Sequence, residues 1–306
     1  MRPYVDGKFL AIENERVWLR GVTYGTFAPD REGARFGTRE RVRDDFAAMA
    51  ANGINAIRTY TAPPRWFLDE ALHHGLWVMV GLAWEQHVAV LPDRALAARV
   101  ETSVRTQAAG CAGHPAVLCF AVGNEIPTPI VRWQGRRNVE RFLERLARGV
   151  RTEDPAALVT YVNYPSTEYL RLPFLDFLSF NLYLDHGPAV VRYLARLQNL
   201  AGEKPLVLAE LGFDSRRGGV ARQATVVASQ VEAAFAAGCA GSFVFAWTDE
   251  WHRGEDEVRD WDFGMTDRGR HPKPALQSLR RAYEQVDEPP ASAPLVSVVV
   301  CTYNGA

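Results

Sequence analysis

Short apolar segments alternate with longer amphipathic segments along most of this chain. The short segments are hydrophobic at nearly every position, which is typical of strands buried on both faces in a parallel sheet. They predict strands over 17–24, 54–60, 76–84, 116–122, 158–163, 177–183, 206–209 and 241–247, preceded by a hairpin strand at 8–12. The longer segments carry apolar residues at helical spacing and predict helices over 39–52, 64–74, 93–109, 137–151, 189–200, 222–237 and 274–286.

The number and order of these elements point to one fold class. Eight strands interleaved with helices over roughly 250 residues match a TIM barrel, the closed (β/α)8 fold. We therefore expect a single α/β domain over 1–286, with a short N-terminal β-hairpin. A doubly wound open sheet is the alternative, but no glycine-rich phosphate-binding loop follows the first strand.

The last twenty residues break this pattern. Residues 287–294 (DEPPASAP) have the composition of a linker. Residues 295–306 then begin a new apolar strand and turn, so we expect them to be the truncated start of a second domain.

Charge and hydropathy exclude several classes of protein. The 306 residues include 35 Lys plus Arg and 36 Asp plus Glu, a net charge of −1, which leaves no basic field for nucleic acid or an anionic membrane. The N-terminus has no apolar core of a signal peptide, and no apolar segment approaches the ~20 residues that span a bilayer. We expect a soluble protein without a membrane span, located in the cytoplasm.

The four cysteines, Cys111, Cys119, Cys239 and Cys301, show no CxxC spacing and have no histidine pair at metal-ligand spacing nearby. This pattern predicts buried free thiols and neither a disulfide framework nor a structural zinc site.

Candidate active-site residues are sought where barrel strands end, because active sites of TIM barrels lie at the C-terminal face. Those ends carry Tyr24, Arg58, Tyr60, Trp84, Glu85, His87, Asn124, Glu125, Asn163, Tyr164, Asn181, Tyr183, Glu210, Trp247, Asp249 and Glu250. Glu125 and Glu210 directly follow apolar segments on the fourth and seventh strands, which lie across the barrel mouth from each other. A retaining glycosidase needs such a pair about 5–5.5 Å apart, one carboxyl protonated and the other ionised.

Other strand-end residues are candidates for orienting this pair or binding a sugar. Arg58 and Tyr183 would keep Glu210 ionised and oriented, and Asn124 would bond a sugar hydroxyl. Trp247 and Trp84 offer flat apolar faces, and Tyr24, Glu85, His87 and Asn163 complete the predicted substrate contacts. Each alone has a structural alternative: an ion pair for Arg58, packing for Tyr183 and Trp247, and a solvated loop for His87.

Several motifs occur in the order found in glycoside hydrolase family 2. Residues 113–125 (GHPAVLCFAVGNE) resemble the acid/base segment of that family, and 204–212 (KPLVLAELG) resemble its nucleophile strand. Residues 19–24, 53–59, 241–247 and 270–275 resemble its first and second barrel strands and the end of its catalytic domain. The resemblance covers about 8–286 and implies a barrel of clan A, retention of configuration, Glu125 as acid/base and Glu210 as nucleophile.

The chain also departs from the family pattern. Family members normally carry β-sandwich domains before the barrel, and their second strand usually continues into a His-Tyr-Pro turn where this chain has Tyr60, Thr61, Ala62 and Pro63. A bare barrel also resembles the wider clan, including family 5. Residues 297–305 (SVVVCTYNG) are similar to the opening strand of family 2 glycosyltransferases, which implies a fused domain that uses cytoplasmic nucleotide sugars.

The sequence thus favours a retaining hydrolase or transglycosylase that acts on a β-linked oligosaccharide or polysaccharide, with β-glucan as the favoured substrate and no cofactor. The alternative is a catalytically inactive carbohydrate-binding barrel that positions glycan for the fused glycosyltransferase. A metal-dependent hydrolase would need a cluster of His and Asp at the strand ends, which this chain lacks.

Overall fold

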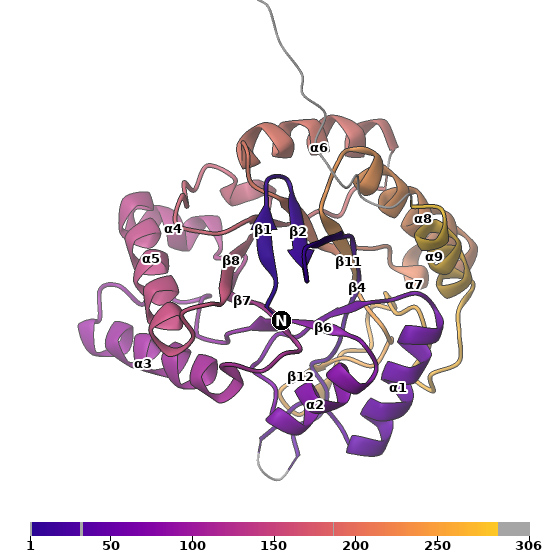
Figure 1. Ribbon diagram of the computed structural model, residues 1–306, viewed down its shortest axis with the longest axis horizontal. Coiled ribbons are helices and arrows are strands. Elements are labelled where there is room, and N and C mark those ends of the chain that lie inside the picture. Colours follow the sequence, from indigo (N-terminus) through magenta and orange to yellow (C-terminus); the bar gives the residue numbers. More distant parts are fainter. Residues whose placement is uncertain (1, 31–32, 186, 287–306) are drawn as a thin grey trace, which may run out of the picture.

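A computed structural model describes residues 2–30, 33–185 and 187–286 of the chain (Figure 1). Eight parallel strands close into a barrel in which each strand pairs with the next along the chain and β11 pairs with β4. They are β4 (Leu19–Thr23), β5 (Ala56–Arg58), β6 (Trp77–Gly81), β7 (Val117–Asn124), β8 (Leu158–Asn163), β9 (Leu178–Asn181), β10 (Leu206–Leu211) and β11 (Gly241–Val244). The predicted TIM barrel is therefore confirmed.

Helices surround the barrel, as Figure 1 shows. The seven predicted helices are α1 (Arg39–Ala51), α2 (Arg65–His73), α3 (Arg94–Cys111), α5 (Arg136–Glu153), α6 (Gly187–Ala201), α8 (Val220–Ala236) and α9 (Pro274–Glu284). Two short helices, α4 (Thr128–Gln134) and α7 (Ser215–Gly218), were not predicted. Between β8 and β9 the chain forms only the 3-10 turn η1 (Pro165–Thr167), so this strand pair lacks the usual crossover helix.

The N-terminus forms a three-stranded antiparallel sheet rather than a hairpin. Its strands are β1 (Tyr4–Asp6), β2 (Phe9–Ile12) and β3 (Glu15–Val17). The predicted strand 17–24 is divided, because Val17 pairs with Leu10 in this sheet whereas Leu19 pairs with Gly241 in the barrel. Leu10 is fully buried against barrel residues that include Leu19 and Phe243, so the sheet covers the N-terminal end of the barrel.

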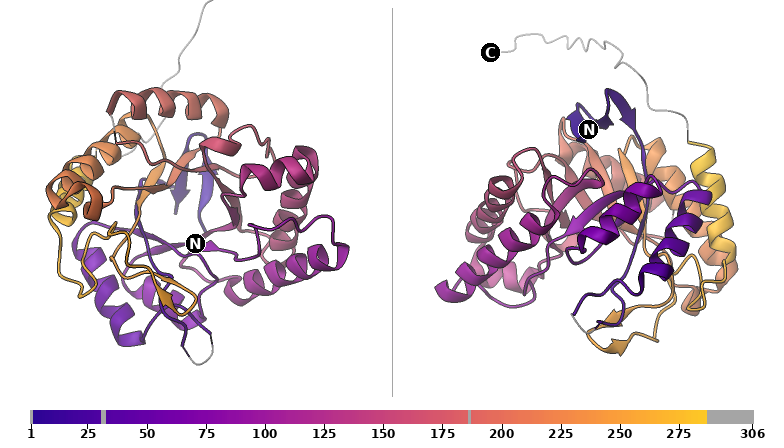
Figure 2. Two further views of the ribbon diagram at one scale, coloured as in Figure 1. Left: turned by 180° about the vertical axis from the view of Figure 1, so that it is seen from behind. Right: turned by 60° about the horizontal axis from the view of Figure 1, so that its bottom comes forward.

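A long segment, 245–273, connects β11 to α9 at the opposite end of the barrel. It contains the two-stranded hairpin of β12 (His252–Arg253) and β13 (Asp256–Glu257). The right view of Figure 2 shows this hairpin at the end of the molecule away from the N-terminal sheet. The backbone N–H of His252 donates to the Thr26 carbonyl (2.8 Å), which joins the hairpin to the segment after β4.

The expected linker 287–294 and second-domain start 295–306 lie outside the described residues. Within the described part of the chain, no helix is both long and apolar enough to cross a membrane. Cys111, Cys119 and Cys239 are buried free thiols, as predicted, and Cys301 lies in the undescribed tail.

Candidate active site

The two glutamates lie at the C-terminal ends of opposite barrel strands. Glu125 directly follows β7, and Glu210 is the fifth residue of β10, with only 7% of its surface exposed. They are close enough for the charge of Glu210 to raise the pKa of Glu125. The structure therefore brings the predicted pair together at the barrel mouth.

Glu210 accepts hydrogen bonds from three side chains, which lie at the ends of β5 and β9. Arg58 Nη1 and the Tyr60 hydroxyl donate to Oε1 at 2.8 and 2.9 Å, and the Tyr183 hydroxyl donates to Oε2 at 2.6 Å. The Arg58 guanidinium also lies over the Tyr60 ring, 4.7 Å from its centroid. One cation and two phenols thus fix the position of the Glu210 carboxylate.

The two phenols remain donors because their protons are held tightly. Burial, followed by the charge of Glu210, raises the pKa of both Tyr60 and Tyr183 well above the usual value. Both hydroxyls therefore keep their protons across the pH range in which an enzyme works.

Arg58 also connects Glu210 to the other glutamate. Its Nη2 donates to Asn124 Oδ1 at 2.8 Å. The Asn181 amide donates to Glu125 Oε1 at 2.8 Å and to Asn124 Oδ1 at 3.2 Å. One hydrogen-bonded network therefore fixes the relative position of the two carboxyl groups.

Glu125 occupies an unusual backbone and electrostatic position. Its φ is +49°, a left-handed value that non-glycine residues adopt mainly in turns and at functional sites. Its N–H donates to the Val162 carbonyl at 2.9 Å, and the next N–H, of Ile126, donates to the Tyr161 hydroxyl at 2.9 Å. Burial, followed by the charge of Glu210, raises the pKa of Glu125, and the bond from Asn181 acts in the opposite direction.

Aromatic side chains from segment 245–263 pack against the two tyrosines. Trp251 contacts the Tyr60 ring (centroids 5.0 Å apart), and Phe263 contacts the Tyr183 ring (5.8 Å). Phe245 lies between them, 4.8 Å from Trp251 and 5.4 Å from Phe263. We call this set, together with Trp261, the aromatic wall.

Two predicted substrate contacts are corrected by the structure. Tyr24 and Trp247 are each only 1% exposed. Both donate to the buried Asp45 carboxylate at 2.8 Å, through the Tyr24 hydroxyl and the Trp247 indole N–H. Each aromatic side chain with one polar atom satisfies that atom inside the core, so we assign both to packing.

The other predicted contacts make no hydrogen bond to Glu125 or Glu210 among the described residues. Asn163 is buried and bonds Thr167, which fixes the turn after β8. The Trp84 indole donates to the Val122 carbonyl at 2.9 Å and packs on Phe142 of α5. Glu85 and His87 are exposed on the segment after β6.

Three residues of the network were not assigned from sequence. Tyr60 and Asn181 stand at strand ends, but the spacing did not indicate which strand-end side chains point inward. Gln86 accepts from the Asn124 N–H at 2.7 Å and lies in a segment without periodicity, so no sequence signal could have indicated it.

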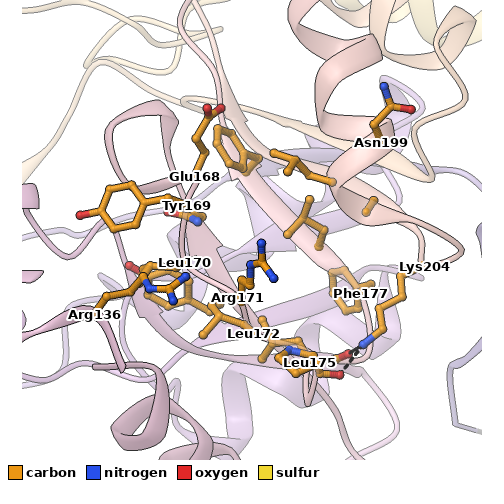
Figure 3. A pocket seen from close by; sticks show the side chains of 17 residues that line it. Arg136, Glu168, Tyr169, Leu170, Arg171, Leu172, Leu175, Phe177, Asn199 and Lys204 are labelled. Atoms are coloured by element: carbon orange, nitrogen blue, oxygen red, sulfur yellow. Dashed lines mark hydrogen bonds between the residues drawn. The ribbon is translucent and has the colours of Figure 1, made fainter. Parts of the chain in front are cut away.

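A separate hollow of about 750 Å³ lies outside the barrel between α5 and α6, beside β8 and β9 (Figure 3). It occupies the place of the missing crossover helix. The Lys204 ammonium closes one end by donating to the carbonyls of Pro173 (2.6 Å) and Leu175 (2.5 Å). Neither Glu125 nor Glu210 lines this hollow, so it is separate from the carboxylate pair.

Comparisons with known proteins agree with this geometry. The family model described as "Glycosyl hydrolases family 2, TIM barrel domain" matches residues 4–288. No curated protein sequence matches significantly.

Solved structures share the fold at low sequence identity. A β-glucuronidase from Ruminococcus gnavus in complex with uronic deoxynojirimycin has a TM-score of 0.79 and 16% identity, over 92% of this chain and 52% of that one. A family 2 β-galacturonidase from Eisenbergiella tayi bound to galacturonate has a TM-score of 0.77 and 17% identity, over 94% and 54%. A β-glucuronidase from Faecalibacterium prausnitzii has a TM-score of 0.77 and 17% identity, over 94% and 52%. The chain therefore spans about half the length of these structures.

Proposed function

The chain belongs to glycosyl hydrolase family 2, and on that premise we propose that it is a retaining glycosidase or transglycosylase that acts on a β-linked glycan through a covalent glycosyl-enzyme. The observation that carries this proposal is that the two glutamates have different surroundings. Burial favours the protonated form of Glu125, whereas Glu210 accepts hydrogen bonds from the Arg58 guanidinium and two phenols. This division is the one that acid and nucleophile require.

In the first step Glu210 attacks the anomeric carbon and Glu125 gives its proton to the departing oxygen. Oε2 of Glu210 is the attacking atom in this proposal, because it accepts one hydrogen bond and Oε1 accepts two. The glycosidic C–O bond breaks, the aglycone leaves with the proton from Glu125, and the sugar becomes esterified to Glu210.

In the second step Glu125, now ionised, takes a proton from water or from a sugar hydroxyl. The resulting oxygen attacks the anomeric carbon, the ester bond breaks, and Glu210 leaves as a carboxylate. Two inversions give net retention, and no cofactor takes part. Water gives hydrolysis, and a sugar hydroxyl gives a longer glycan.

β-Glucan remains the proposed substrate, and the glycosyltransferase-like tail supports both the transfer reaction and a cytoplasmic location. The named structural neighbours are β-glucuronidases and a β-galacturonidase, so uronides are the competing substrate class.

The test is mass analysis of products from a panel of β-linked gluco-, galacto- and manno-oligosaccharides together with β-uronides. Wild type is compared with Glu210→Gln and with Glu203→Gln, which alters an exposed glutamate on the loop before β10. We expect turnover by the wild type and Glu203→Gln, loss of at least about 10³-fold in Glu210→Gln, and a β-configured first product by NMR.

Longer products would establish transfer, and only shorter products would establish hydrolysis. An α-configured first product, or turnover unchanged in Glu210→Gln, would overturn the proposed mechanism. Glycan binding without turnover would favour the inactive binding barrel instead.

A further inference from the structure

The aromatic wall ends in a stacked pair formed by Arg253 of β12 and Trp261, which follows the hairpin of β12 and β13. The Arg253 guanidinium lies over the Trp261 ring, 5.5 Å from its centroid. Trp261 in turn contacts Phe263 (5.7 Å), which contacts Tyr183, the donor to Glu210 Oε2. A continuous series of contacts therefore connects Arg253 to the nucleophile.

Arg253 differs from the other arginines of segment 245–273 in having no carboxylate partner among the described residues. Arg259 pairs with Glu257, Arg268 with Glu257 and Asp262, and Arg270 with Asp45 and Glu250. Arg253 is exposed, and Trp261 is partly buried. An indole that holds a guanidinium in place leaves its N–H groups free to donate to a ligand.

The proposed reaction indicates whether Arg253 and Trp261 lie on the glycone or the aglycone side of the two glutamates. Glu125 protonates the departing group, so the aglycone leaves towards Glu125. The aromatic wall packs on Tyr60 and Tyr183, which hold Glu210. Because Glu210 attacks the face of the anomeric carbon opposite the departing oxygen, we infer that the aromatic wall borders the sugar that stays on the enzyme, the glycone.

We propose that Arg253, supported by Trp261, forms a glycone-side subsite that binds a neutral sugar residue beyond the one that becomes attached to Glu210. Arg253 donates to hydroxyls of that sugar, and the uncovered part of the indole packs against its C–H face. This inference rests on the proposed glycosidase function, and it adds recognition of at least two sugar units on the glycone side.

The charge of the hairpin favours a neutral ligand over a uronic acid. Glu255, Asp256 and Asp260 are exposed and have no ion-pair partner among the described residues. Three unpaired carboxylates beside one unpaired guanidinium repel an anionic sugar and leave a neutral one unaffected.

The test compares Arg253→Ala with Arg259→Ala, an exposed arginine of the same hairpin that is paired with Glu257. Substrates are an aryl β-monoglycoside, the β-linked oligosaccharide series from two to six units that the panel selects, and a uronide analogue of that series. We expect Arg253→Ala to lower kcat/KM for the longer substrates roughly tenfold and to leave the monoglycoside unchanged. Arg259→Ala leaves both unchanged, and Trp261→Phe retains more activity on long substrates than Trp261→Ala.

Failure of this subsite and failure of the proposed function give different results. Equal behaviour of Arg253→Ala and Arg259→Ala at every chain length would overturn the subsite and leave the glycosidase intact. If Arg253→Ala lowers kcat/KM only for the uronide series, the proposed preference for a neutral sugar is overturned. If the wild type cleaves nothing, calorimetric titration with the neutral β-linked gluco-, galacto- and manno-hexasaccharides decides. Weaker binding of any of them by Arg253→Ala than by Arg259→Ala supports the subsite, and equal binding by both variants, or no binding, overturns it.

Discussion

Glu125 and Glu210 are the same residue type in two environments, and the difference has a cost in stability. Because the folded-state pKa of Glu125 is raised, the protonated side chain fits the fold better than the ionised one. The stability that this proton contributes is fully present below about pH 4.5 and is lost as pH rises through the folded-state pKa. Above that pKa the protein holds a partly buried charge at Glu125 that does not stabilise the fold.

We predict that Glu125→Gln stabilises the protein more at pH 8 than at pH 5. Glutamine keeps the shape of the protonated acid and cannot ionise. The free energy of unfolding should therefore rise by about 1 kcal/mol at pH 8, the usual size for a stabilising substitution at a functional site. Thermal unfolding at both pH values measures it. Glu203→Gln, at an exposed position, is the control and should show no such trend. A gain for Glu125→Gln that shrinks as pH rises would contradict the burial argument.

For single residues, the sequence predicted the positions of charged and amide side chains in the site better than those of aromatic side chains. Glu125, Glu210, Arg58 and Asn124 converge as predicted, because a charged or amide side chain at the end of a buried strand has few places to go except the mouth. Aromatic strand-end residues gave no such guidance. An indole or phenol at that position satisfies its polar atom equally well inside the core, as Tyr24 and Trp247 do, or in the cleft, as Tyr60 does.

Among the elements, segment 245–273 is held by ion pairs rather than by regular secondary structure. The Lys273 ammonium, 9% exposed, donates to both Asp249 oxygens (3.0 and 3.2 Å) and to the Ser215 hydroxyl (2.9 Å). Burial raises the pKa of Asp249, and Lys273 opposes that shift. Lys273 thus fixes the C-terminal end of segment 245–273, the segment that also contains the aromatic wall.

We predict that Lys273→Met lowers the free energy of unfolding by about 3 kcal/mol, because it leaves Asp249 buried without its cation. Urea unfolding measures the loss. The double variant Lys273→Met with Asp249→Leu should recover most of it, since no charge remains unpaired. Arg280→Met, which breaks an exposed pair with Glu284 on α9, should cost less than about 1 kcal/mol. A Lys273→Met loss as small as that of Arg280→Met would show that Asp249 is solvated or neutral.

Elements with a strong period were located well from sequence, and irregular ones were not. Strand β8 and helix α1 lie within a residue of their predicted bounds, because a continuous apolar run marks the strand and apolar residues at helical spacing mark the helix. Helix α4 was missed since it has one proline among its seven residues, another at its N-cap, and too few turns to show a period. Hairpin β12–β13 was not predicted, because charged residues fill it and two-residue strands carry no alternation.

For the whole molecule, the order of strands predicted barrel closure, but not what covers its two ends. Closure follows from eight repeated units, whereas each end depends on contacts between residues far apart in the chain. At the N-terminal end the cover is the three-stranded sheet, whose Leu10 packs against buried residues of β4 and β11. The sequence placed a strand there and gave no sign that its leucine completes the barrel core.

We predict that Leu10→Ala destabilises the entire barrel by about 3 kcal/mol, the usual range for a cavity left by a buried leucine. Leu72→Ala on α2 is the matched control, because Leu72 is 46% exposed and Leu10 is fully buried. It should change stability by less than about 0.5 kcal/mol. Urea unfolding of both variants, followed by tryptophan fluorescence and far-UV circular dichroism, makes the comparison. If the N-terminal sheet belongs to the same cooperative unit as the barrel, both signals of Leu10→Ala shift together to lower urea with an unchanged slope, because one transition reports the entire buried surface. A loss seen by one probe alone would show that the sheet unfolds separately from the barrel it covers.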